Sequence, residues 1–549
     1  MIPSIPTQLW RLSALVVAAL VLVACRSGTE ATAPVPANPW LDEIELDSPI
    51  VIANNRRLSD GQWNRLMSPA RWPGLLDGAA QWRRYPSIGG ILDQLQTAER
   101  WRAAGFDPNG FFAVHARPNQ LIARLPLSDV EAFWRWWSQL QPDWPPATAG
   151  PDDGSTATRM TLPAGRWLSE QAAPSVVELV ARADHLTVIW HLAGTNNQSG
   201  RRVPPAINPW TAKRWHRFNE DHRFDGHLSA RINLDTALTQ AGWVSAACRA
   251  LWPPDALPVR SIRLGTHRLD DNQLHWRASI DTPLWRPDPT LDEPTGPAVD
   301  ATAVRHAKIA GIGFAVNLSR IRERMLAWTD AADAGASACP HAEALSRQRR
   351  RVRSLANRPI PPLFSGVMGL TSRLEGWADT STGPAPQYAT ELFLRDPQVV
   401  LGLAQLFSPD LARLDLRPNQ TPVALPKKLT DMVAGVPVYL STTPSSIRAS
   451  ATPDVPRQRS TRSQQRLLGD SASDDVVPWV MGVVQLDQLD VLRDSLSLWP
   501  AIAAQAEWLE RVRSWGQITQ TERIEFQLGV DRSSLEVDLS MAGGTSTPQ

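Results

Sequence analysis

Short runs of alternating apolar and polar residues recur along the chain, in pairs that flank polar turns. Clear examples are residues 260–280 (RSIRLGTHRLDDNQLHWRASI), 364–378 (FSGVMGLTSRLEGWA) and 523–541 (RIEFQLGVDRSSLEVDLSM). Alternation with a period of two places apolar side chains on one face of a β-strand, and two such runs around a turn predict a hairpin. The pattern therefore predicts antiparallel sheets that bury one face.

Helix signals separate these hairpins from the strands before them. The segments Ile232–Asp235, Val316–Ser319 and Val484–Asp487 each end a strand with a polar residue, a leucine and an Asp or Ser. An Asp or Ser oxygen at that position accepts a free backbone N–H of the first helical turn. We therefore expect a strand–helix–hairpin unit at all three places.

Two further segments, 111–127 and 390–407, carry a related pattern. The first leads into a helix that we expect to be capped near Ser128. The second has Asp396 as the cap and Pro397 at the first helical position, where proline needs no N–H partner. Each is followed by a further hairpin pattern, at 176–193 and at 436–451 respectively.

These units form two sets, which predicts an internal duplication with halves at 40–285 and 300–549. The expected fold class is α+β, built of duplicated strand–helix–hairpin units with antiparallel sheets and helices packed on one face. A chain of 549 residues is also too long for a single core, which predicts more than one domain. The arrangement resembles some uncharacterised families of exported bacterial proteins, and this resemblance implies no activity.

Segments without apolar periodicity predict the loops between these elements. They are 145–158, 194–213, 284–303, 379–387 and 443–475. The last is rich in Ser, Arg and Pro and poor in apolar residues, so we expect it to be disordered.

Residues 1–24 have the pattern of an export signal. Arg11 is their only charged residue, and an apolar run of thirteen residues extends from Leu12 to Ala24. As a helix this run is about 20 Å long, whereas a bilayer core is about 30 Å thick. A positive residue before a short apolar run is typical of a signal peptide.

The apolar run ends in Leu22-Val23-Ala24-Cys25, which resembles the lipobox of bacterial lipoproteins residue for residue. The resemblance implies cleavage before Cys25 and a thioether from its thiol to diacylglycerol. Two or more acyl chains would anchor the chain stably, whereas one would be marginal. The alternative is an ordinary secretory signal that contains a cysteine by chance.

The residues after Cys25 refine this expected address. Arg26 stands where Asp commonly retains lipoproteins in the inner membrane, so the resemblance implies the periplasmic face of the outer membrane, given a Gram-negative host. Residues 25–39 lack apolar periodicity, and we expect them to form a flexible tether that spaces the body by roughly 20 Å from the lipid.

Charge and cysteine content constrain the class of partner and the structure. The 56 basic and 55 acidic residues nearly cancel, which argues against a nucleic-acid or general polyanion binder. Cys248 and Cys339 remain after Cys25 is lipidated. In an oxidising periplasm they are expected to form a disulfide, for which the chain-entropy model gives about 4–5 kcal/mol.

The richest group of metal-ligating side chains lies in residues 216–227 (HRFNEDHRFDGH). His222, Asp225 and His227 are candidates to face one ion, with His216 nearby. Their spacing matches neither an HExxH nor a CxxC…H pattern. The alternative to a metal site is a polar loop before a strand, and we favour this interpretation. We therefore predict no metal and no other cofactor.

Three further patterns have a structural interpretation beside a functional one. Phe133 and its neighbours in FWRWW predict a buried helix face, with Trp136 on the opposite side as a candidate for stacking on a glycan. Gly311 and Gly313 predict close packing in a strand rather than a dinucleotide site. A run of arginines predicts either a solvated helix face or a contact with lipid phosphates. It comprises Arg347, Arg349, Arg350, Arg351 and Arg353.

The sequence contains no G-x-S-x-G motif and brings no general acid and base together. We therefore expect a non-enzymatic, lipid-anchored periplasmic protein that binds or scaffolds another envelope component. One alternative is an envelope hydrolase or metal-dependent enzyme that uses residues 216–227. Another is a carrier of lipid or glycan with a groove between its halves.

Overall fold

The computed structural model describes part of the chain. The described residues are 38–67, 95, 97–118, 120–140, 148–149, 158–163, 176–191, 206–234, 236–237, 259–270, 273–282, 301–315, 318–330, 342–359, 366–380, 383–430, 437–453, 477–489, 516, 521–531 and 534–543. The signal segment, Cys25, Cys248 and Cys339 lie outside them, and so does the predicted disulfide. Of the helices in the described part, none is both long and apolar enough to span a bilayer.

Backbone contacts divide the chain into two compact units. Unit 1 comprises Met1–Arg249 and Val259–Ser279, and unit 2 comprises Ala250–Pro258 and Ile280–Gln549. Both units are built mainly of antiparallel strands with helices between them, so the α+β class is confirmed.

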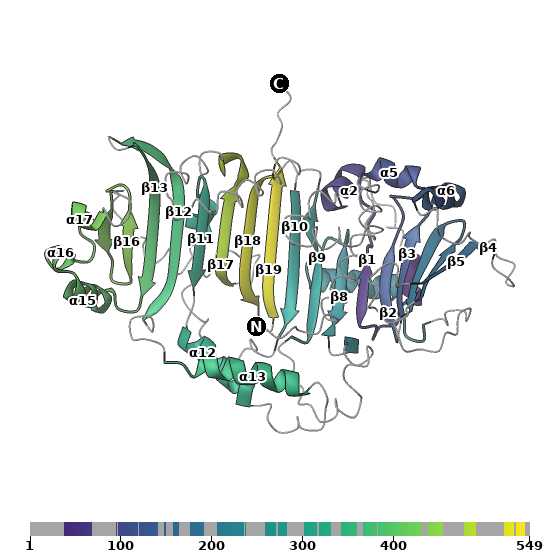
Figure 1. Ribbon diagram of the computed structural model, residues 1–549, viewed down its shortest axis with the longest axis horizontal. Helices are drawn as coiled ribbons and strands as arrows, with labels where there is room; N and C mark the ends of the chain where they lie inside the picture. The colour runs from purple at the N-terminus through teal and green to yellow at the C-terminus, as the bar shows by residue number, and fades with distance from the viewer. Residues whose placement is uncertain are drawn as a thin grey trace. The chain divides into compact units, whose positions relative to one another are not determined.

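Unit 1 contains an antiparallel sheet whose strands lie in the order β4-β5-β6-β7-β3-β2-β1-β8-β9-β10 (Figure 1). The hairpins predicted at 176–193 and 260–280 are confirmed as β6–β7 and β9–β10, and the segment 111–127, which was expected to lead into a helix, contains a further hairpin, β2–β3. The strands are β1 (Ile50–Ala53), β2 (Ala113–Arg117), β3 (Gln120–Pro126), β4 (Thr148–Ala149), β5 (Thr158–Pro163), β6 (Val176–Ala181), β7 (His185–His191), β8 (Ser229–Asn233), β9 (Ser261–Leu269) and β10 (Gln273–Asp281).

Helices of unit 1 build two aromatic clusters. The helices are η1 (Pro39–Glu43), α2 (Asp60–Met67), α5 (Ala98–Ala103), α6 (Val130–Leu140) and α8 (Thr211–Asp221). In the first cluster, Leu41 of η1 and Trp215 and Phe218 of α8 pack against Val51 and Ala53 of β1. The second joins α2, α5 and α6 through a chain of ring contacts, which involves Trp63, Trp101, Phe106 and Phe133.

Helix α8 corrects the sequence interpretation of this region, because part of the predicted loop 194–213 and of the pre-strand loop is helical. Trp215, Phe218 and His222 are spaced by three and four residues, which places them on one helical face. Trp215 and Phe218 are buried, and the charged residues between them conceal this pattern in the sequence.

The core role predicted for the FWRWW segment is confirmed, since Phe133 and Trp137 are buried. The opposite-face placement of Trp136 is wrong. Its ring is half-buried and contacts the rings of Phe106, Phe133 and Trp137. The cap is also displaced by one residue, because Asp129, not Ser128, accepts from the N–H of Ala132.

Unit 2 contains an antiparallel sheet in the order β14-β15-β16-β13-β12-β11-β17-β18-β19 (Figure 1). The predicted hairpins at 436–451 and 523–541 are confirmed as β15–β16 and β18–β19. The strands are β11 (Ala310–Ala315), β12 (Val367–Thr380), β13 (Gly383–Leu394), β14 (Val423–Ala424), β15 (Tyr439–Thr442), β16 (Ser446–Ser450), β17 (Val477–Gln485), β18 (Thr521–Asp531) and β19 (Ser534–Gly543).

Several predictions in unit 2 are wrong. The loop expected at 379–387 is largely strand, because β12 extends to Thr380 and β13 begins at Gly383. Residues 364–378 form no hairpin, because residues 367–380 form one strand, β12, whose polar residues Thr371–Arg373 pair with β11 on one side and with β13 on the other. The loop expected at 443–475 begins too early, since β16 occupies Ser446–Ser450. Residues 454–475, the rest of that loop, lie outside the described part.

The helices of unit 2 are α11 (Ala301–Arg305), α12 (Leu318–Asp330), α13 (Ala342–Ala356), α15 (Pro397–Phe407), α16 (Pro409–Ala412), α17 (Lys427–Thr430) and η6 (Leu486–Gln488). Asp396 caps α15 and Pro397 begins it, as predicted. The close packing expected at Gly311 is also confirmed, because a Cβ there would lie 2.7 Å from the carbonyl oxygen of Val304 in α11.

Candidate functional site

The structure separates the four predicted metal candidates into three environments. His216 lies on α8, where its Nε2 is 3.2 Å from Oε1 of Glu220, one helical turn away. Both side chains are more than 60% exposed, so this contact is a solvated surface pair.

His222 follows α8 directly and packs against aromatic rings. Its imidazole centroid lies 4.9 Å from that of Phe218 and 5.8 Å from that of Phe224. Burial, followed by the positive charge of Arg263, lowers the pKa of His222 to about 4. The ring is therefore neutral at pH 7 and part of the core edge.

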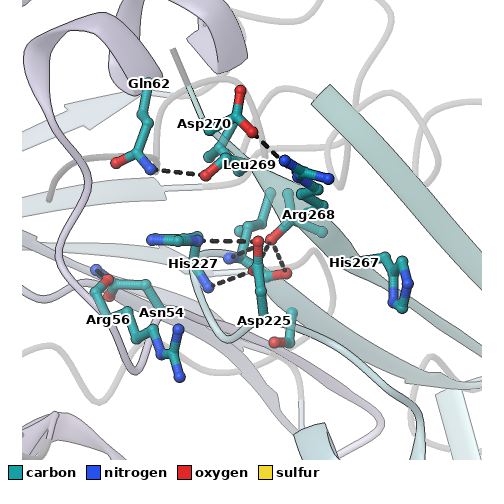
Figure 2. A network of polar contacts seen from close by, with 12 residues as sticks. Asn54, Arg56, Gln62, Asp225, His227, His267, Arg268, Leu269 and Asp270 are labelled. Carbon is teal, nitrogen blue, oxygen red and sulfur yellow. Dashed lines mark hydrogen bonds and ion pairs between the residues drawn. The ribbon is translucent and has the colours of Figure 1, made fainter. Parts of the chain in front are cut away.

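Asp225 and His227 meet in a polar network between α8, β8 and β9 (Figure 2). One Asp225 oxygen, Oδ1, accepts from the backbone N–H of His227 at 2.9 Å and from the hydroxyl of Thr266. The other, Oδ2, is 2.9 Å from Nδ1 of His227. That last contact is close enough for an ion pair but is not aligned as a hydrogen bond.

Backbone bonds show what this network stabilises. The Asp225 N–H donates to the carbonyl of Thr266 at 2.8 Å, and the Gly226 carbonyl accepts from the N–H groups of Asn55 and Arg56 at 2.8 and 3.0 Å. Gly226 has a φ of +83°, which glycine adopts without strain. The Asp225 carboxylate therefore organises a tight turn that joins β9 to the segment after β1.

The arrangement does not bring the four candidate metal-ligating residues together. Within the described residues, no group of three or more His, Cys, Asp or Glu side chains is placed to hold a metal ion. An Asp–His pair can orient a general base, but the Thr266 hydroxyl donates to Asp225 and so is not directed at the imidazole. The contacts of this network stabilise a turn.

A second polar cluster, which the sequence interpretation missed, centres on Arg124 of β3. Its guanidinium donates to the hydroxyl of Thr187 and to the carboxylate of Glu43, and it lies 5.7 Å from the centroid of the Trp40 ring. The Arg124 side chain is only 8% exposed. The Trp40 ring in turn lies 4.5 Å from that of His185. The two terminal nitrogens of this buried arginine therefore have partners within the fold, a carboxylate and a hydroxyl, whereas its buried Nε has no hydrogen-bond partner among the described residues.

His115 of β2 is the least satisfied of the buried polar side chains around this cluster. The residue is 1% exposed, and neither ring nitrogen has a hydrogen-bond partner in the described part of the chain. Burial, with smaller contributions from the charges of Arg117 and Arg124, lowers the pKa of His115 to about 3. The imidazole is therefore held neutral at every pH near 7.

Acid should destabilise the fold through His115. Its pKa is about 6.5 when unfolded and about 3 when folded, so protons bind the unfolded state first as the pH falls. Between pH 6.5 and 3, proton binding to the unfolded state lowers the free energy of unfolding by about 1.4 kcal/mol per pH unit. The total loss is roughly 2 kcal/mol at pH 5. Urea unfolding at pH 7.5 and at pH 5.0 measures this loss of stability.

A His115→Leu variant should lose roughly 2 kcal/mol less between those two pH values than the wild type does. His216→Gln removes an exposed histidine and is the matched control, with an unchanged pH dependence expected. Equal pH dependence of wild type and His115→Leu would contradict the assignment.

Comparison with known proteins assigns no family. The chain matches no protein-family model, and neither a curated protein nor a solved structure is significantly similar to it. The function is therefore argued from the residues and contacts of this chain.

Proposed function

We propose that the chain is a lipid-anchored bacterial envelope protein that binds or scaffolds another envelope component without catalysing a reaction. The observation that carries this proposal is Leu22-Val23-Ala24-Cys25 at the end of an apolar run. A thioether-linked lipid on Cys25 holds the body at a membrane. Arg26 favours the periplasmic face of the outer membrane.

The contacts of the candidate metal-ligating residues support binding over catalysis. His216 pairs with Glu220 at the surface, His222 packs against Phe218, and Asp225 organises a turn. Each of these side chains has a structural role that needs no substrate. A scaffold requires a stable body and exposed faces, which these interactions provide.

The strand orders support the internal duplication that belongs to this proposal. In unit 1, β1 lies between β2 and β8, and in unit 2, β11 lies between β12 and β17. Outward on one side follow β3, β7 and β6, matched by β13, β16 and β15. On the other side follow β9 and β10, matched by β18 and β19. Two copies of one architecture suit a protein that presents related binding surfaces.

A second candidate function, carriage of a lipid, is favoured by one face of the unit 2 sheet. Ile312 is 46% exposed and Phe526 is 37% exposed, and the Phe526 ring lies over Gly482 on the strand between them. The equivalent face in unit 1 is closed, since Ile52 and Val114 are 0% exposed. Accessible apolar surface of this kind is typical of binding sites. Lipid that remains bound in stoichiometric amount after purification would favour this function.

Replacing Cys25 with serine tests the proposed function. Cells grown with a labelled fatty acid should incorporate the label into the wild-type chain, and Cys25→Ser should abolish incorporation completely, because only a thiol forms the thioether. Cys248→Ser is the matched control and should retain the label. Label on Cys25→Ser, or none on the wild type, would refute the anchor.

A further inference from the structure

We propose that unit 2 contacts anionic phospholipid headgroups through the exposed basic face of the helix pair α12–α13. This inference rests on the proposed function, because the lipid on Cys25 is what holds the chain beside a membrane. It adds a second, electrostatic contact that involves residues about 300 positions away in the sequence.

Positive charge is concentrated in this helix pair. Residues 318–330 and 342–358 together contain nine arginines and three acidic residues, in a chain whose net charge is +1. Excluding these two segments, the rest of the chain is therefore slightly acidic. A local basic surface on a neutral chain favours docking on one anionic surface over general polyanion binding.

Some of the arginines hold the two helices together. The Arg349 guanidinium lies 5.5 Å from the centroid of the Trp328 ring, and Arg349 is 7% exposed. Arg353 pairs with Asp330 at 2.8 Å, and Nε of Arg322 donates to the carbonyl of Ala356 at 2.7 Å. These contacts fix which side of α13 faces α12.

The other arginines of α13 face solvent. Arg347, Arg350 and Arg351 are exposed, and so is Arg358, which follows the last helical residue, Ala356. Positions 347, 350 and 351 are spaced by three and four residues, which places them on one side of α13. Figure 1 shows α12 and α13 beyond one end of the unit 2 strands, so the pair projects from the sheet.

The chemistry of this face fits phospholipid headgroups. A guanidinium presents a planar set of donors that matches the oxygens of a phosphate. Leu355, on the same helix, is 55% exposed and provides an apolar side chain that can enter the interface between headgroups and acyl chains. An Arg-rich helix with an exposed apolar residue is the composition that interfacial helices use.

Vesicle binding tests the inference. The probe is the chain from residue 26 onward, which lacks the signal and the lipidated cysteine but keeps every described residue. It should sediment with phosphatidylcholine vesicles that contain phosphatidylglycerol, and not with phosphatidylcholine alone. Binding should weaken steeply as the salt concentration rises, because the contact is electrostatic.

The decisive variant is Arg350→Gln/Arg351→Gln/Arg358→Gln. Each arginine near an anionic surface contributes about five-fold in affinity, so the triple variant should bind at least about ten-fold more weakly. The matched control, Arg395→Gln/Arg413→Gln/Arg417→Gln, removes the same charge from exposed positions elsewhere in unit 2 and should bind within about two-fold of wild type.

Three results would overturn the inference. They are equal binding to both vesicle types, equal losses in the two triple variants, and tighter binding to a DNA duplex than to vesicles at the same phosphate concentration. The last would identify a nucleic-acid site. Because the probe carries no lipid, its result is independent of whether Cys25 is acylated, and failure of one proposal is distinguishable from failure of the other.

Discussion

A Gly105→Ala variant should lose about 3–5 kcal/mol of its free energy of unfolding. Gly105 has a φ of +84°, a region that residues with a Cβ rarely adopt. A Cβ there would also overlap the carbonyl oxygen of Asp129 and the backbone nitrogen of Phe133. Both atoms belong to the start of α6, so relief requires the helix to move rather than a side chain to rotate.

Gly402→Ala is the matched control, in the middle of α15. No heavy atom lies within 4 Å of its Cβ position, and alanine favours a helix interior. This variant should gain about 0.5–1 kcal/mol. Urea unfolding followed by tryptophan fluorescence measures both, and a Gly105→Ala variant as stable as the wild type would contradict the packing of α6 against this turn.

Trp215→Ala should destabilise unit 1 by about 3–5 kcal/mol. Trp215 is 0% exposed, and its ring centroid lies 5.0 Å from that of Trp210 and 4.9 Å from that of Phe218. Truncation removes the largest side chain that α8 packs against β1 and leaves a cavity.

Trp136→Ala provides the comparison, because that ring is half-buried at the edge of its cluster. Trp136→Ala should lower the free energy of unfolding by less than about half as much as Trp215→Ala does, since less apolar area leaves the protein interior. Unfolding curves for the two variants and the wild type measure the difference. A loss below about 1 kcal/mol for Trp215→Ala would mean that α8 does not close the core.

Local signals in the sequence are sufficient to predict most of the hairpins and one helix cap. Residues 260–280 and 523–541 alternate cleanly around polar turns, and both fold as hairpins. Asp396 and Pro397 begin α15, as their chemistry predicts. Alternation does not distinguish a hairpin from one long strand at 364–378, because the polar residues Thr371–Arg373 pair with β11 and β13 instead of forming a turn.

The candidate site was harder to predict because its contacts are not local. The Arg124 guanidinium finds its carboxylate on Glu43, which is 81 positions away, and nothing in the sequence near either residue indicates the pairing. Asp225 and His227 are close in sequence, so the sequence alone is enough to group them. Their role became evident only through Thr266, on β9, and through the backbone groups that bond to the same turn.

We propose that Cys25 is lipidated, and mass spectrometry of the N-terminal peptide tests this modification. Cleavage after glutamate releases Cys25–Glu30 (CRSGTE) from a chain purified from bacterial membranes. We predict that this peptide begins at Cys25 and carries the added mass of a diacylglyceryl group. An unmodified peptide, or a mature chain that begins at any other residue, would contradict the account.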